Sequence, residues 1–142
     1  RKMGAKNLIY TEKKIHFKEG DIIFKENDEG AKEMYFIDSG RVKIVKKVGD
    51  ANATLATLDE GDFFGEMSLI SGNKRCATAI AFTNCKVHTM DKKTFEYNLT
   101  NDIKFMRKIL ETLTRRLEDT DTNLKRHIQR ISRLTKVFNV TG

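Results

Sequence analysis

The sequence predicts a mainly β domain followed by helices. From residue 14 to about 90, short apolar or alternating runs are separated by turn signals, a spacing typical of an antiparallel sandwich or barrel. From about residue 102 the apolar residues recur with the period of a helix. The 142 residues, 39% hydrophobic and 33% charged, have the length and composition of one ordinary globular domain with a real core.

The first half contains the predicted strands. Polar and apolar residues alternate most clearly over 41–46, as in a half-buried strand. The other expected strands are 14–17, 22–24, 34–37, 54–58, 77–82 and 85–90. Gly20, Gly40 and Gly61 follow acidic or small residues at turns, where a positive φ costs glycine little.

The second half contains two predicted helices. Asp91 can cap a short helix through Asn98, and Asn101 or Asp102 can cap a long one over about 102–136. The long helix carries apolar residues at steps of three and four, with Thr120 where the heptad expects an apolar residue. These residues are Ile103, Met106, Leu110, Leu113, Leu117, Leu124, Ile128, Ile131 and Leu134.

The long helix indicates a homodimer. A helix of that length spans roughly 50 Å, more than a small sandwich can cover. Part of its apolar seam is therefore expected to meet a second copy of the chain. The alternative is a helix folded wholly against its own domain.

The net charge of +7 is concentrated in the second half. Residues 104–136 hold ten Lys or Arg and four Asp or Glu. Such a stripe can bind nucleic acid or an acidic membrane, or it can simply be a solvated helix face. Two cysteines favour a reduced, cytoplasmic setting. There is no apolar run long enough for a membrane span and no signal-like segment, so no membrane partner is expected.

The stretch from Phe64 to Ala79 carries the chemistry. Residues 65–70 fit about one turn of helix, whose first N–H groups can meet an anion. Arg75 can fork two donors onto a phosphate, and Glu66 can accept only from a donor such as a sugar hydroxyl. One arginine balances the single charge of a cyclic phosphodiester. The alternative is an ordinary surface Glu–Arg pair.

These residues resemble the phosphate-binding cassette of cyclic-nucleotide-binding domains, the module of protein kinase A regulatory subunits, cyclic-nucleotide-gated channels and bacterial catabolite activator proteins. The matching motifs are 17–24, 34–44, 61–65 and 75–78, within a resemblance over roughly 10–136. It implies an antiparallel, double-stranded jelly-roll-like β-roll with a short phosphate-binding helix and a long C-terminal helix. The implied organisation is a β-roll over 1–100 with its cassette at 64–79, a lid and dimerisation helix over 101–137, and a tail over 138–142.

The resemblance also implies roles for single residues. Glu66 would accept the ribose 2′-hydroxyl, Arg75 would pair with the cyclic phosphate, and backbone N–H groups of Gly65, Glu66, Ser68 and Cys76 would complete the cradle. Thr120, three residues after Leu117, would contact the base. The full set of expected ligand-binding residues is Gly65, Glu66, Met67, Ser68, Arg75, Cys76, Ala77, Thr120 and Asp121.

Cyclic AMP is the expected ligand, with cyclic GMP as the alternative. Cyclic-GMP-selective members often carry a threonine where this chain has Cys76, and a thiol is a weak donor and acceptor. Asp121 departs from the serine of the related activators. The chain ends at Gly142 without room for a recognition helix, so either an output domain lies elsewhere or the long helix is the output.

Other functions fit the sequence less well. His16, His88 and His127 do not form a cluster, so no metal site of the cupin type is expected. Neither a cofactor nor enzymatic activity is expected. Cys76 beside Arg75 could be a redox-sensitive thiol. A ligand-free dimerisation module and DNA binding by the basic helix alone remain alternatives.

Overall fold

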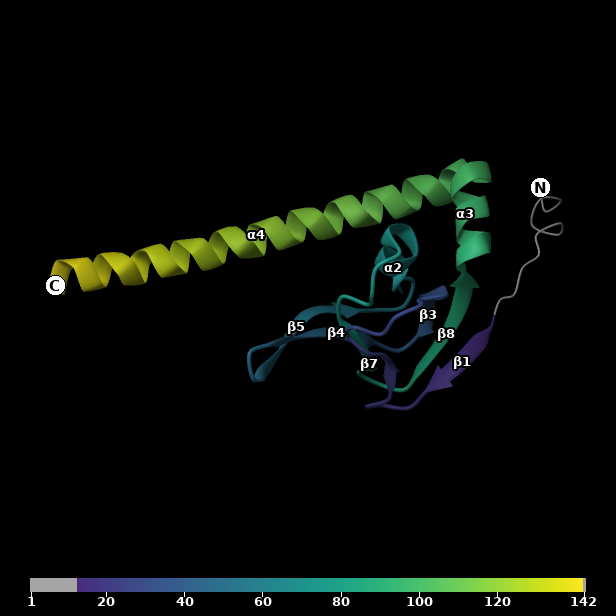
Figure 1. Ribbon diagram of the computed structural model, residues 1–142, viewed down its shortest axis with the longest axis horizontal. Helices are drawn as coiled ribbons and strands as arrows, with labels where there is room; N and C mark the ends of the chain where they lie inside the picture. Colours follow the sequence, from purple (N-terminus) through teal and green to yellow (C-terminus); the bar gives the residue numbers. More distant parts are fainter. Residues whose placement is uncertain (1–12, 142) are drawn as a thin grey trace. The chain divides into compact units, whose positions relative to one another are not determined.

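The computed structural model of the protein describes residues 13–141, which form two units (Figure 1). The first unit runs to Glu96 and the second begins at Tyr97. Among the described residues, the strands lie in the first unit, and the second is helical except at Asp102.

The first unit is built from two antiparallel four-stranded sheets, with strand orders β1-β8-β3-β6 and β2-β7-β4-β5. This confirms the predicted antiparallel β-roll. The strands are β1 (Lys14–Phe17), β2 (Ile22–Phe24), β3 (Glu33–Ser39), β4 (Val42–Val48), β5 (Ala51–Leu58), β6 (Phe63–Phe64), β7 (Thr78–Ala81) and β8 (Cys85–Asp91). The sequence did not predict β6, because two residues are too few to show a period.

The hydrophobic core takes side chains from both sheets. Its members are Tyr35, Ile37, Val42, Leu58, Phe64, Ala79, Ala81, Cys85 and Val87. Phe17 of β1 and Phe24 of β2 are half-buried against this cluster. The alternation of buried and exposed residues along β7 and β8 is the pattern of strands with one face on a core.

Three turns share one sequence pattern, x-Glu-(Gly or Asn)-Asp. They span residues 18–21, 25–28 and 59–62. In each, the third residue has a positive φ: 89° at Gly20, 72° at Asn27 and 89° at Gly61. The side chain of the closing Asp accepts a hydrogen bond from the backbone N–H of the first residue, at 2.8, 3.0 and 2.9 Å in chain order. This is the local side-chain bond that makes Asp a turn former.

Each of these turns holds one residue from a distant segment by two backbone hydrogen bonds. The third turn residue donates its N–H to that residue's carbonyl, and that residue's N–H donates to the carbonyl of the closing Asp. The residues held are Ala81, Arg75 and Ile37, by the turns at 18–21, 25–28 and 59–62 respectively. All six distances lie between 2.7 and 2.9 Å. The same device therefore anchors β7, β3 and the segment that carries Arg75.

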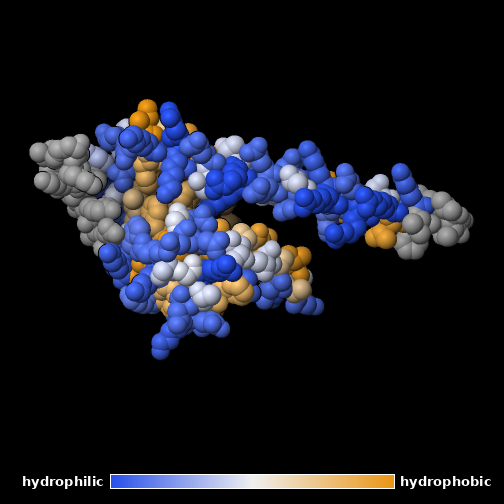
Figure 2. Space-filling view, turned by 180° about the vertical axis from the view of Figure 1, so that it is seen from behind, coloured by the Kyte–Doolittle hydropathy of each residue, from blue (hydrophilic) through white to orange (hydrophobic). Residues whose placement is uncertain are grey.

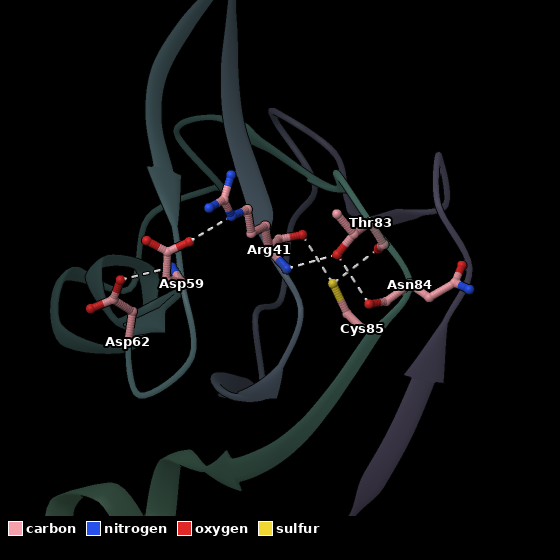
Figure 3. A network of polar contacts seen from close by, with 6 residues as sticks. All are labelled: Arg41, Asp59, Asp62, Thr83, Asn84 and Cys85. Carbon is pink, nitrogen blue, oxygen red and sulfur yellow. Dashed lines mark hydrogen bonds and ion pairs between the residues drawn. The ribbon is translucent and has the colours of Figure 1, made fainter.

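A polar network closes the end of the core near Gly40 (Figure 3). The Arg41 N–H donates to Thr83 Oγ1 at 3.0 Å, and the Cys85 thiol lies 3.0 Å from the Arg41 carbonyl oxygen. The Arg41 side chain also pairs with Asp59 at 3.0 Å. Because Cys85 is fully enclosed by these contacts, its role is structural.

The helices are α2 (Glu66–Ser71), α3 (Lys92–Asn101) and α4 (Ile103–Thr141). Side chains of Asp91 and Asp102 cap the last two, accepting from the N–H groups of Thr94 at 2.8 Å and Phe105 at 3.1 Å. Helix α4 continues five residues past the predicted end at 136 and includes most of the predicted tail at 138–142. No proline or glycine occurs between residue 103 and Gly142, so nothing in the sequence stops the helix earlier.

The predicted apolar seam of α4 is largely exposed within its own unit. Leu117 is 70% exposed, and Leu110, Leu124, Ile128, Ile131 and Leu134 are between 53% and 57% exposed. From the side shown in Figure 2, hydrophilic side chains cover most of this helix. No helix within residues 13–141 is long and apolar enough to cross a membrane.

Replacing Gly40 by Ala should destabilise the first unit strongly. Gly40 has a φ of 91°, and an added Cβ would lie 2.3 Å from the Asn84 carbonyl oxygen and 2.9 Å from Cys85 Sγ. We expect a loss of about 3 kcal/mol or more in the free energy of unfolding, measured by urea denaturation. Gly20→Ala is the matched control, because Gly20 has a φ of 89° and no atom within 4 Å of the added Cβ. It should cost only about 1 kcal/mol, and equal losses at the two positions would contradict the steric argument.

Candidate functional site

Two glycines in left-handed conformations bound the short helix α2. Gly65 precedes it with a φ of 82°, and Gly72 ends it with a φ of 75° and donates its N–H to the Ser68 carbonyl at 2.9 Å. Glycine is needed at such positions because a Cβ disfavours them. The conformation of Gly65 thus determines that the short helix begins at Glu66. Glu66 is buried, with only 3% of its surface exposed.

Arg75 is a buried cation held by backbone oxygens. The residue is 5% exposed. Its Nη1 donates to the Gly65 carbonyl at 2.6 Å, and its Nη2 donates to the Glu33 carbonyl at 2.8 Å. A guanidinium has five N–H donors, so these bonds leave three for another acceptor. The arginine is therefore fixed beside α2 while keeping donor capacity.

An aromatic cluster supports the guanidinium. The Arg75 Cζ lies 4.1 Å from the centroid of the Phe24 ring, which is a cation–π contact. Phe24 in turn packs against Tyr35 and Phe64, with ring centroids 5.8 and 5.9 Å away. A Cβ on Gly65 would lie 3.0 Å from Arg75 Nη1 and 3.2 Å from Phe24 Cε2. Gly65 is thus required by space as well as by its φ.

The surroundings of Arg75 shift its pKa in two opposite directions, and burial has the larger effect. Burial lowers the pKa of Arg75, while Tyr35, Glu33, Asp28 and Glu66 act in the opposite direction. Arginine nevertheless stays charged, because its ordinary pKa lies far above neutrality. Burial, with the nearby Glu33 carboxylate, raises the pKa of Tyr35 to about 12, so its phenol is neutral here.

The remaining cassette residues surround this centre. The Ser68 hydroxyl donates to the Lys74 carbonyl at 3.3 Å, which ties α2 to the segment leading into Arg75. Cys76 is exposed, and its carbonyl accepts from Lys46 Nζ at 2.6 Å. Met67 is 58% exposed, whereas Ala77 is buried. The structure thus brings together the predicted residues from Gly65 to Ala77, and their contact with a ligand stays a prediction.

Lys46 also links the cassette to a second acid. Its Nζ lies 3.3 Å from Glu26 Oε2, and the other carboxylate oxygen accepts from the Lys47 N–H at 3.0 Å. The Lys47 backbone bond, together with the two lysine charges, lowers the pKa of Glu26. Glu26 belongs to the turn at 25–28, so this turn meets the cassette through both backbone and side chains.

Thr120 and Asp121 belong to the second unit. Both are exposed on α4. The Thr120 hydroxyl donates to the Arg116 carbonyl at 2.9 Å, and Asp121 pairs with Lys125 at 3.2 Å. Their contact with a ligand held by the cassette stays a prediction.

Sequence reasoning missed the residues that hold Arg75. Phe24 and Glu33 were not assigned to the site, and the turn at 25–28 was not predicted. The turn could have been found from its sequence, since Lys25-Glu-Asn-Asp28 repeats the pattern of Lys18-Glu-Gly-Asp21 with Asn in place of Gly. Asn is the non-glycine residue that most readily takes a positive φ.

The histidines of the described chain show no metal-binding arrangement. His88 Nδ1 lies 2.7 Å from Asp38 Oδ1, and its ring stacks on Phe36 at 4.9 Å. Among residues 13–141, no group of three or more His, Cys, Asp or Glu is placed to hold a metal ion.

Comparison with known proteins adds an independent line of evidence. A family model described as "Cyclic nucleotide-binding domain" matches residues 14–102. The chain is 37% identical over 93 residues to a cAMP-dependent protein kinase regulatory subunit of Schizosaccharomyces pombe, covering 66% of this chain and 22% of that protein. It is 30% identical over 111 residues to a CRP-like cAMP-activated global transcriptional regulator of Mycobacterium tuberculosis, covering 78% and 49%.

The fold is likewise that of a solved relative. The crystal structure of Thermus thermophilus catabolite activator protein superposes with a TM-score of 0.71 at 27% identity, covering 80% of this chain and 54% of that one. The chain spans between about a fifth and half of the length of these relatives.

Proposed function

Because the chain belongs to the cyclic nucleotide-binding domain family, we propose that it is a non-catalytic regulatory module that binds cAMP. Arg75 pairs with the cyclic phosphate, and Glu66 accepts the ribose 2′-hydroxyl. The observation that carries this proposal is the buried, charged Arg75 with three uncommitted donors, set 2.6 Å from the Gly65 carbonyl at the start of α2. A buried cation with spare donors is suited to an anionic ligand.

The charge balance favours a ligand with one negative charge. Arg75 is a buried cation, and Glu33, Asp28 and Glu66 raise its pKa against the larger effect of burial. A cyclic phosphodiester adds one negative charge beside one arginine. A nucleoside triphosphate would bring several, and most of them would be buried without a partner.

The hydrogen bond of Thr120 favours adenine over guanine. The hydroxyl donates its proton to the Arg116 carbonyl, so its oxygen can act toward a base only as an acceptor. At C6 adenine presents an amino donor and guanine an oxygen; the donors of guanine lie at N1 and C2, so this preference holds where Thr120 faces C6. Thr120 in a lid over the bound base would therefore match cAMP. Binding of cGMP remains the alternative ligand preference, because the Cys76 thiol does not exclude it.

Signalling would proceed through α4. In this proposal the bound base draws Thr120 of α4 over the cassette, and the shift in the population of helix positions is the output. The exposed seam of α4 would meet a second copy of the chain, which makes the module a homodimer. The two cysteines favour a cytoplasmic setting for it. A domain outside residues 1–142, or α4 itself, would pass on the signal. A ligand-free dimerisation module is the second candidate, favoured by the same exposed seam.

Arg75→Ala should lower the affinity for cAMP by about a hundredfold or more, because it removes a buried charged partner of the phosphate. Isothermal titration calorimetry on nucleotide-free protein measures the effect. Arg41→Ala is the control, since Arg41 is an exposed arginine paired with Asp59. For the wild-type protein, 2′-deoxy-cAMP and 5′-AMP should bind more weakly than cAMP. Affinity of Arg75→Ala within about a factor of two of wild type, in a protein that still melts cooperatively, would contradict the phosphate role.

Thr120→Ala should weaken cAMP binding about threefold to tenfold and reduce the preference for cAMP over cGMP, because one hydrogen bond to the adenine amino group is lost. Thr122→Ala is the control, because it removes a threonine hydroxyl that lies about 200° around the helix from Thr120. It should change neither the affinity for cAMP nor the preference for cAMP over cGMP. Competition titrations with both nucleotides give the ratio of the affinities for cAMP and cGMP. An unchanged ratio in Thr120→Ala would rule out the lid assignment.

Leu124→Lys should weaken dimerisation about a hundredfold or more, because it places a charge from each subunit in the seam. Gln129→Lys adds the same charge on the exposed opposite side of α4 and should leave the dimer intact. Sedimentation equilibrium over a range of concentrations distinguishes the two. A monomeric wild type, or a Leu124→Lys variant that dimerises normally, would refute the seam assignment.

A further inference from the structure

The geometry points to residues Phe24–Asp28 as the positioning element of Arg75: Phe24 fixes the guanidinium, and the turn that follows fixes the backbone of the same residue. This inference rests on the proposed function, since Arg75 is the residue given to the cyclic phosphate. It adds determinants of affinity that would not touch the ligand. Both are inferred to change affinity through the position of Arg75.

The side-chain contact is the cation–π contact between Arg75 and Phe24. The Arg75 Cζ lies over the Phe24 ring, 4.1 Å from its centroid. Phe24 is held in place by Tyr35 and Phe64, which also pack on each other at 5.1 Å. The ring therefore restrains the cation in addition to the two backbone carbonyls that accept from Nη1 and Nη2.

The backbone contact is made by the turn at 25–28. The Asn27 N–H donates to the Arg75 carbonyl at 2.7 Å, and the Arg75 N–H donates to the Asp28 carbonyl at 2.9 Å. The turn is closed by Asp28 Oδ2, which accepts from the Lys25 N–H at 3.0 Å. Glu26 extends the contact, since its N–H donates to Thr78 Oγ1 at 2.9 Å. The backbone N–H and the backbone carbonyl of Arg75 are thus both held by the turn.

The chain contains its own comparison. The turn at 18–21 makes the same two bonds, but the residue that it holds is Ala81 of β7, which is buried in the core. Loss of that turn should cost stability alone. Loss of the turn at 25–28 should cost stability and also move Arg75.

The backbone arm of the test compares Asp28→Ala with Asp21→Ala. Calorimetric titration with cAMP should show affinity about threefold to tenfold weaker for Asp28→Ala and unchanged for Asp21→Ala, with similar losses of thermal stability. Asp28→Asn keeps an oxygen acceptor for the Lys25 N–H and removes the charge, so it should retain most of the wild-type affinity. Equal affinities for the two Ala variants would overturn this part of the inference.

The side-chain arm compares Phe24→Leu with Phe17→Leu. Both rings are half-buried on the same core cluster, and only Phe24 contacts Arg75. Phe24→Leu should weaken cAMP binding about fivefold to thirtyfold, whereas Phe17→Leu should leave it unchanged. In an Arg75→Ala background Phe24→Leu should have no further effect, because the contact is already gone. A further loss there would show that Phe24 acts by another route.

A spectroscopic readout separates this inference from the proposed function. The Arg75 Nε–Hε resonance, assigned by its absence in Arg75→Lys, should show an upfield ring-current shift in the ligand-free protein. Phe24→Leu should abolish the shift and Phe24→Tyr should preserve it. No cAMP binding by the wild type would refute the proposed function, whereas the resonance would still decide whether Phe24 holds Arg75. An unshifted resonance in the wild type would overturn the inference itself.

Discussion

The burial of one guanidinium is the constraint around which this β-roll is organised. Taking a cation out of water is costly unless its donors and its charge find partners. Arg75 meets that requirement through the carbonyls of Gly65 and Glu33, the face of Phe24 and the field of nearby acids. Each partner then becomes restricted in turn. Gly65 has no room for a side chain, and Phe24 must remain aromatic to keep its contact.

A single structural device serves both the core and the candidate binding site. Three turns of the same four-residue pattern each hold a distant residue by a pair of backbone hydrogen bonds. Two of the held residues, Ile37 and Ala81, are members of the hydrophobic core, and the third is Arg75. The site is thus built from the same local chemistry as the scaffold. At this turn the held residue is a buried arginine, whereas at the other two turns it is an apolar core residue.

Local patterns in the sequence predicted most of the fold. Alternation gave the longer strands, glycines with positive φ gave the turns at Gly20, Gly40 and Gly61, and Asp91 and Asp102 capped the helices as expected. The resemblance of residues 64–79 to a phosphate-binding cassette indicated the candidate site, and the ligand contacts of Glu66 and Arg75 stay predictions. The sequence did not reveal β6, whose two residues show no period, or the role of Phe24, because a contact between segments distant in the chain leaves no local signal. The turn at 25–28 was missed because Asn27 is a weaker turn signal than glycine.

The pair of hydrogen bonds between Arg75 and the turn at 25–28 also determines where this domain can accept changes in length. An insertion between Phe24 and Asp28 would separate the ring that supports the guanidinium from the turn that holds its backbone. Just beyond Asp28, the chain is exposed at Glu29 and Gly30, and Glu29 makes only a surface ion pair with Lys74 at 3.5 Å. Within residues 24–30, loops of different length, or a grafted peptide, are therefore compatible with the arginine when they enter after Asp28.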